Sequence, residues 1–144
     1  MKIAILNGPN LNLLGRREPD LYGTRSFEDY LEELRRDFPQ VCFEYCQSNH
    51  EGVLIDRLQE AGFRCDGIVL NAAAYTHTSI ALADAVRAVP APVMEVHLTD
   101  IEAREPFRRL SYLKDVCAGR FVGLGLESYR KAVEALIALN YQPK

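Results

Sequence analysis

The sequence contains none of the short motifs that usually bind a metal ion or a nucleotide. Its three histidines, His50, His77 and His97, lie far apart in the chain, and none belongs to an HxxxH or HExxH array. No GxGxxG follows the first apolar run, and Gly123-Leu124-Gly125 lacks the spacing of a dinucleotide fingerprint. A phosphate-binding P-loop is absent as well. We therefore expect a protein that uses neither a metal nor a cofactor.

Cysteines are few and isolated, and no CxxC pair occurs among Cys42, Cys46, Cys65 and Cys117. A chain of 144 residues can fold around a core without crosslinks, so we expect buried, reduced thiols. On one strand, Cys42 and Cys46 would lie roughly 13 Å apart, which is too far for a mutual disulfide.

The sequence also lacks an excess of charge of either sign and a long apolar run. Its 17 basic and 20 acidic residues nearly cancel, so no one-signed field favours a nucleic acid or a membrane surface. The first apolar run, Ile3–Leu6, is too short for a signal peptide or a membrane span. We expect a cytoplasmic protein that acts on a small molecule, with no nucleic-acid or membrane partner.

Apolar runs of strand length alternate with segments of helical periodicity. The expected strands are Lys2–Leu6, Val41–Gln47, Asp66–Leu70, Pro92–His97 and Gly119–Gly123. The expected helices run from a Ser26 cap to Pro39, from Val53 to Gly62, from Ile80 to before Pro90, and from Tyr129 to Leu139. This alternation predicts one α/β domain over residues 1–144. Its fold is a flavodoxin-like, three-layer doubly wound sandwich with a five-stranded parallel sheet of order 2-1-3-4-5.

One connection is too long for such a fold. About eighteen residues, 8–25, separate the first strand from the first helix, whereas βα loops usually have about two to six. We expect this segment to be a lid over the site. It contains Arg17 and Tyr22, and a guanidinium close to a tyrosine could stabilise the phenolate that a base requires. A solvated arginine and a half-buried tyrosine remain the alternative. Asn10 follows Gly8-Pro9. This segment is either a plain turn or a proline-restricted turn that holds Asn10 rigidly near the end of the first strand.

His97 ends the fourth expected strand, and Glu95 stands two residues before it on the same face. The carboxylate could orient the imidazole and favour its protonated form, as a general acid needs. A structural histidine is the alternative. Because His77 is expected at the start of a helix, where a cation is disfavoured, it suits hydrogen bonding to neutral hydroxyls. His50 is interpreted as a helix-start residue.

Thr99-Asp100-Ile101-Glu102 has the pattern of a capping box, so Leu98 and Thr99 are expected to present backbone N–H groups to an anion. Arg104 and Arg108 could reach the same place, although pairing with Glu105 on an ordinary surface is equally available.

Together these motifs resemble those of the type II 3-dehydroquinate dehydratases over essentially the whole chain. The matching stretches are residues 7–19 with Tyr22-Gly23, Gln47–Gly52, Asn71 with Thr76–Ser79, Glu95–His97, Ala103–Arg108 and Gly123–Gly125. Each is weak alone, but their order along one chain is specific.

The resemblance implies a cofactor-free lyase that converts 3-dehydroquinate to 3-dehydroshikimate in the shikimate pathway, assembled as a homododecamer of four trimers. Tyr22 would be the base, with Arg17 as its electrostatic partner, and Asn10 would hold a water against the enolate. His97, oriented by Glu95, would protonate the leaving hydroxyl. The remaining contacts to substrate would come from Asn71, His77, Leu98, Thr99, Arg108 and, from a neighbouring subunit, Asp84.

Two other functions of the same fold are considered. A phosphoryl-receiving module needs acidic residues at strand ends that Asn7 and Asn71 occupy, and a flavin-binding module needs a hydroxyl-rich phosphate loop that Gly8-Pro9-Asn10-Leu11 does not provide. A scaffold that binds without catalysing would not need Arg17, Tyr22 and His97 together. Thr99-Asp100 departs from the Ser-Asn common in the family, and we expect Asp100 to point into the helix cap.

Overall fold

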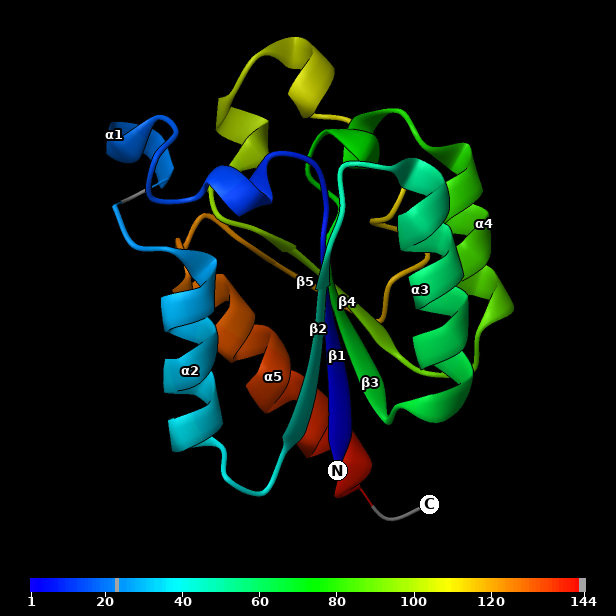
Figure 1. Ribbon diagram of the computed structural model, residues 1–144. Helices are drawn as coiled ribbons and strands as arrows, with labels where there is room; N and C mark the ends of the chain where they lie inside the picture. The colour runs from blue at the N-terminus through cyan, green and yellow to red at the C-terminus, as the bar shows by residue number, and fades with distance from the viewer. Residues whose placement is uncertain (23, 143–144) are drawn as a thin grey trace.

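The sheet is the one that the strand pattern predicted. A computed structural model describes residues 1–22 and 24–142, without the side chains of residues 21 and 22. Its five parallel strands are β1 (Lys2–Asn7), β2 (Cys42–Gln47), β3 (Gly67–Asn71), β4 (Val93–His97) and β5 (Gly119–Val122). They lie in the order β2-β1-β3-β4-β5, which confirms the predicted flavodoxin-like topology (Figure 1).

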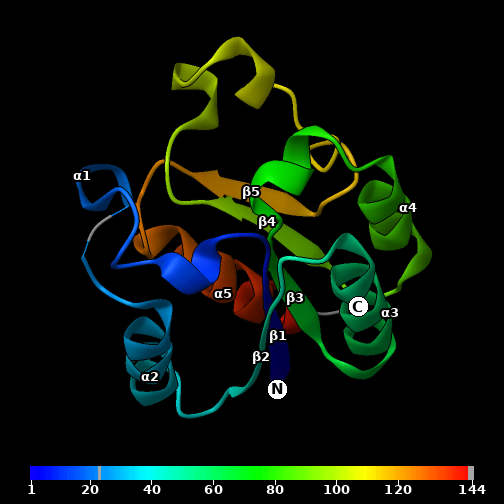
Figure 2. The same cartoon turned by 45° about the horizontal axis from the view of Figure 1, so that its top comes forward.

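Helices cover both faces of this sheet. On one face lie α2 (Phe27–Asp37) and α5 (Glu127–Asn140), and on the other α3 (Glu51–Arg64) and α4 (Ile80–Ala88) (Figures 1 and 2). Alternate residues of β1 feed two separate cores: Ile3 and Ile5 pack with the first pair of helices, Ala4 and Leu6 with the second. Two covered faces explain why the strands are continuously apolar.

The predicted helix boundaries hold closely, with one exception. The hydroxyl of Ser26 caps α2 by accepting a hydrogen bond from the Asp29 amide at 3.2 Å. Gly62, expected to close its helix, lies instead inside α3. A Cβ atom at this glycine would stand 2.3 Å from Cβ of Val89. Gly62 therefore permits close packing and does not terminate the helix.

The segment between β1 and α2 is partly folded. It contains the 3₁₀ helix η1 (Leu11–Leu13) and the short helix α1 (Pro19–Tyr22). Leu11 and Leu14 are buried in the core on the α2 side. The first half of the predicted lid is therefore anchored to the body of the molecule, and its second half begins at Gly15, which has a φ of 91°.

Three further 3₁₀ helices, all short, lie in the loops that follow β3 and β4. They are η2 (Ala73–His77), η3 (Ile101–Ala103) and η4 (Pro106–Arg108). Figures 1 and 2 show η3 and η4, in yellow, standing above the carboxyl ends of the strands together with η1 and α1. The connections that carry the candidate residues thus gather at one edge of the sheet.

The expectation of buried thiols is correct for one cysteine of four. All four are free, but only Cys65 is buried, while Cys42 is exposed because β2 is an edge strand. Within residues 1–22 and 24–142, no helix is long and apolar enough to cross a membrane.

Candidate active site

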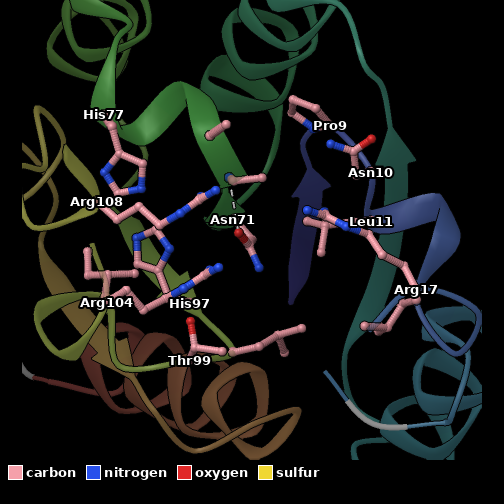
Figure 3. Close-up of a pocket in the computed structure, with 15 residues that line it drawn as sticks. Pro9, Asn10, Leu11, Arg17, Asn71, His77, His97, Thr99, Arg104 and Arg108 are labelled. Atoms are coloured by element: carbon pink, nitrogen blue, oxygen red, sulfur yellow. Dashed lines mark hydrogen bonds between the residues drawn. The ribbon is translucent and has the colours of Figure 1, made fainter. Parts of the chain in front are cut away.

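A cavity opens at the carboxyl ends of β1, β3 and β4, where the rule for doubly wound sheets places a site. It brings together eight of the eleven predicted site residues, seven of which Figure 3 labels. They are Asn10, Arg17, Asn71, His77, His97, Leu98, Thr99 and Arg108. Glu95 lies directly behind His97, and only Tyr22 and Asp84 remain to be located.

His97 and Glu95 form a buried pair at the end of β4. Nε2 of His97 lies 2.7 Å from Oε1 of Glu95, and their side chains are 5% and 0% exposed. A carboxylate only accepts, so Nε2 donates, and Nδ1 is left for other partners. Burial opposes ionisation of Glu95, but hydrogen bonds from His97 and Ser111 and the charge of Arg120 outweigh it and lower the pKa of the carboxyl. The contact expected between Glu95 and His97 is therefore present as a hydrogen bond.

His77 lies next to His97 in the cavity wall but has a different hydrogen-bond pattern. The two rings are nearly parallel, with centroids 6.4 Å apart. Nδ1 of His77 donates to the carbonyl of Leu110 at 2.6 Å, which leaves Nε2 as an acceptor. Burial, and then the charges of His97 and Arg108, lower the pKa of His77. A neutral His77 was predicted, but for the wrong reason: this residue ends η2, and α4 begins only at Ile80.

A series of buried hydrogen bonds fixes the side chain of Asn71. Its amide nitrogen donates to the Tyr129 hydroxyl at 2.9 Å, and that hydroxyl donates to Oδ1 of Asn7 at 2.8 Å. The Ala73 amide donates to Oδ1 of Asn71 at 3.1 Å. Complete burial raises the pKa of Tyr129, so it stays a neutral donor. The ends of β1 and β3 therefore carry the amides of Asn7 and Asn71. A phosphoryl-receiving module requires acidic residues at these positions.

The lining is cationic. Among the described residues around the cavity are three arginines, Arg17, Arg104 and Arg108, and no aspartate or glutamate. Nε of Arg108 lies 3.0 Å from a Glu105 carboxylate oxygen, so the surface pairing that the sequence left open occurs together with a place in the cavity wall. A site with this charge suits a ligand that carries a carboxylate.

The capping-box prediction is partly wrong. Asp100, not Thr99, is the N-cap, and its Oδ1 accepts the Glu102 amide at 3.1 Å. The helix it caps, η3, has only three residues, so no helix-terminal anion site exists there. Asp100 does point into the cap as expected, while Leu98 and Thr99 line the cavity.

Four further candidates complete the survey of the predicted residues. Tyr22 ends α1, but its side chain lies outside the described residues. Asp84 is exposed on α4, where it pairs with Arg87 at 3.2 Å and does not line the cavity. His50 is an exposed helix-start residue, as predicted. Asn10 belongs to the cavity wall, with its backbone N–H donating to Oδ1 of Asn49 at 3.0 Å.

Sequence reasoning missed two side chains behind His97. The Ser111 hydroxyl donates to Oε1 of Glu95 at 2.7 Å, and Nε of Arg120 lies 3.5 Å from Oε2 of the same residue. Glu95 and Arg120 are register partners on β4 and β5. A charged residue within an otherwise apolar strand was the available signal for Arg120. No comparable pattern marks Ser111, which reaches Glu95 from a loop.

Comparison with known proteins identifies the family. The family model for class II dehydroquinases matches residues 1–137. The chain belongs to the class II dehydroquinases, the type II 3-dehydroquinate dehydratases. No group of three or more metal-ligating side chains occurs in the described part of this dehydroquinase.

Individual relatives span nearly the whole molecule. The chain is 55% identical over 138 residues to a 3-dehydroquinate dehydratase of an Exiguobacterium species, covering 95% of this chain and 94% of the relative. It is 46% identical over 144 residues to a catabolic 3-dehydroquinase of Aspergillus clavatus, covering 99% and 95%. The crystal structure of type II dehydroquinase from Butyrivibrio crossotus superposes with a TM-score of 0.91 at 43% identity, covering 95% and 97%.

Proposed function

We propose that this dehydroquinase removes water from 3-dehydroquinate to give 3-dehydroshikimate through an enolate intermediate, without a metal or cofactor. The observation that carries the proposal is the cavity itself, in which a buried His97–Glu95 pair faces a lining with three arginines. An acid beside a cationic cavity is what β-elimination from a hydroxylated carboxylate requires. Residues 1–144 act as one catalytic domain in the cytoplasm.

The first step is proton abstraction from the carbon next to the ketone. Tyr22 is the base, and Arg17, which lines the cavity, keeps its phenolate ionised. The electron pair of the broken C–H bond moves to the carbonyl oxygen and forms the enolate. Asn10 holds a water against that oxygen, so the negative charge develops next to a hydrogen-bond donor.

The second step expels the hydroxyl. As the enolate reforms the ketone, its electrons create the new double bond, and the C–O bond at the β carbon breaks. His97 donates a proton, and the oxygen leaves as water. Because Nε2 is hydrogen-bonded to Glu95, Nδ1 is the ring atom that donates this proton. Glu95 keeps the ring oriented and balances the imidazolium charge.

The remaining cavity residues position the substrate. Asn71, His77 and Arg108 hold ring hydroxyls, and His77 fits this role because its Nε2 is free to accept from a neutral hydroxyl. Leu98 and Thr99 bind the carboxylate. A well-placed acid or base contributes only about 10²–10⁴ in rate, so positioning and enolate stabilisation supply much of the remainder.

Two features extend the site beyond its own cavity. Residues 8–25 form a lid, and the part that closes begins at Gly15, because Leu11 and Leu14 are held in the core. Asp84 reaches the cavity of a neighbouring subunit in a dodecamer of four trimers, which accounts for its exposed position on α4. Light scattering should give a mass of roughly twelve times the 16.3 kDa chain; a monomer would contradict the assembly.

The pathway is proposed to be shikimate synthesis, for the production of aromatic amino acids. The relative from the Exiguobacterium species is called simply a 3-dehydroquinate dehydratase, whereas those from two Aspergillus species and from Penicillium rubens are called catabolic 3-dehydroquinases. Deletion of the gene should create a requirement for aromatic amino acids. Loss of growth on quinate alone, without that requirement, would assign the catabolic role instead.

The direct test follows enone formation by ultraviolet absorbance after 3-dehydroquinate is added. Absorbance should rise equally with and without EDTA. It should also be unaffected by borohydride pretreatment in the presence of substrate, because no imine forms. No rise would refute the proposed function. Inhibition by EDTA would contradict independence from metals, and inactivation by borohydride would indicate a Schiff base.

A further inference from the structure

Behind the His97–Glu95 pair lies a second charged side chain that the reaction does not use directly. Arg120 stands opposite Glu95 on the neighbouring strand, with its Nε 3.5 Å from Oε2. Its side chain is 17% exposed, and it is absent from the cavity lining. Only Nη1 makes a hydrogen bond, to Glu102 at 3.4 Å, while Nε and Nη2 are buried without one. What Arg120 supplies to Glu95 is therefore mainly charge.

The charge of Arg120 offsets an unfavourable feature of the His97–Glu95 pair, which is the burial of an ionised carboxylate. The carboxylate of Glu95 is completely buried, and Oε2 makes no hydrogen bond. Burial disfavours an ionised carboxyl, so a proton shared with His97 would be drawn toward Glu95 and would leave a neutral pair. A neutral imidazole whose proton has moved to Glu95 is a poor acid. A guanidinium stays charged at every relevant pH and favours the ionised carboxylate.

We infer that Arg120 is a positioning residue that holds Glu95 ionised, so that the shared proton stays on Nε2 of His97 and the ring remains an imidazolium that can donate its Nδ1 proton to the substrate. The inference rests on the proposed function, in which His97 is the acid. Arg120 acts through Glu95 and touches neither the cavity nor the reacting atoms.

Other groups around the pair do not replace this charge. The pKa of His77 is lowered, so it supplies no charge at neutral pH, and Ser111 carries no charge, although its hydrogen bond to Oε1 also lowers the pKa of Glu95. The partly buried Cys117 thiol has a pKa of about 12, raised by desolvation and then by Glu95, and stays protonated. The other three arginines, Arg17, Arg104 and Arg108, line the cavity and stand on the cavity side of His97. Among the described residues, the groups on the elements around the pair are His77 on η2, Arg108 on η4, Arg104 between η3 and η4, Arg17 after η1, Ser111 and Cys117 after η4, Arg120 on β5 and its second partner Glu102 on η3.

The first test compares pH profiles of R120Q, R120K and the wild type. Removing a cation stabilises the protonated pair, so the alkaline limb of kcat/KM in R120Q should move up by about one pH unit or more. Near neutral pH its kcat should fall by about three- to tenfold because the imidazolium is depleted, while KM stays unchanged because Arg120 does not line the cavity. R120K, which keeps the charge, should restore most of both. An unshifted limb in a folded, active R120Q would overturn the inference.

Arg35 provides a matched control. It is exposed on α2, on the opposite face of the sheet, where it pairs with Glu32. R35Q loses the same charge and should leave the profile unchanged. A shift equal to that of R120Q would show that net charge alone is responsible, and would contradict a specific role of Arg120.

The second test does not depend on activity or on the folding of R120Q. Infrared difference spectra of the wild type, recorded below the pH at which His97 loses its proton, should contain no carboxylic-acid stretch from Glu95. E95Q identifies that band, and a folded R120Q should display it. A Glu95 acid band in the wild type would overturn the inference. A wild type without dehydratase activity would instead refute the proposed function and leave this measurement interpretable.

Discussion

The Nε2 atom of His97 lies 2.7 Å from Oε1 of Glu95, two residues earlier on the same buried strand. Period-two geometry places both side chains on one face of the sheet, and the end of β4 brings the imidazole to the cavity wall.

The Glu95 carboxylate should matter for the acid form of His97 more than for its position. In E95Q the amide can still accept from Nε2, so the ring stays oriented, but the imidazolium loses its counter-charge. The alkaline limb of kcat/KM should therefore move to lower pH, with kcat reduced about tenfold or more at pH 8. Steady-state pH profiles measure this, and a limb that moves to higher pH would contradict the assignment.

Tyr22 should be the base that takes the first proton. Y22F removes the phenolate that is proposed to accept it, so kcat should fall by about 10²–10⁴ while the fold persists. Solvent exchange of the substrate α proton, followed by NMR, should disappear together with turnover. Tyr141 is 74% exposed near the C-terminus, and Y141F is the matched control expected to keep full activity. Exchange that continued unchanged in Y22F would assign the base elsewhere.

Tyr129 should couple stability to substrate binding. In Y129F the amides of Asn7 and Asn71 lose the hydroxyl that joins them, and a buried group left without a partner costs about 1–3 kcal/mol. The free energy of unfolding, measured with urea, should fall by that amount. KM should rise severalfold because Asn71 is no longer fixed. A stability change with an unaltered KM would show that Asn71 does not contact the substrate.

His77 should make the folded protein less stable in acid. Its folded pKa is lowered from the ordinary 6.5, so below that pH the unfolded chain takes up a proton that the folded chain does not. Stability should therefore decline as pH falls from about 6.5 toward the folded pKa of His77, before Glu95 adds its own loss below its ordinary 4.5. Urea titrations of wild type and H77Q should give a shallower decline for H77Q over pH 6.5 to 5. Equal slopes would contradict a depressed pKa.

Asp100 should act on stability and not on substrate binding. Its side chain caps η3 and lies outside the cavity lining. D100N retains a good cap and should change neither kcat nor KM, whereas D100A should lower the free energy of unfolding by about 0.5–2 kcal/mol. A severalfold decrease of KM in D100N would show that the carboxylate repels the substrate.

Local patterns predicted what depends on local physics. Continuous apolar strands and capped, periodic helices determine the order 2-1-3-4-5, and the alternation along β4 determines the Glu95–His97 contact. The carboxyl ends of parallel strands share one edge, so the strand pattern alone predicts where the cavity lies.

Contacts between distant segments could not be predicted in the same way. Tyr129 donates a hydrogen bond to Asn7, 122 positions away in the sequence. Its aromatic ring fits the apolar face of a helix, so the sequence pattern gave no sign of a role for its hydroxyl. Arg120 reaches Glu95 only through the β4–β5 register. The capping box misplaced its cap by one residue because Thr99 and Asp100 both suit an N-cap, and backbone geometry selects Asp100.

Enone formation from 3-dehydroquinate by wild type, H97A and H50A, measured side by side, tests the central claim most directly. His97 is buried against Glu95 at the cavity, whereas His50 is exposed at the start of α3 and does not line it. The account predicts equal turnover for wild type and H50A, and a kcat lower by about 10²–10⁴ for H97A. Turnover by a folded H97A at the wild-type rate would contradict it.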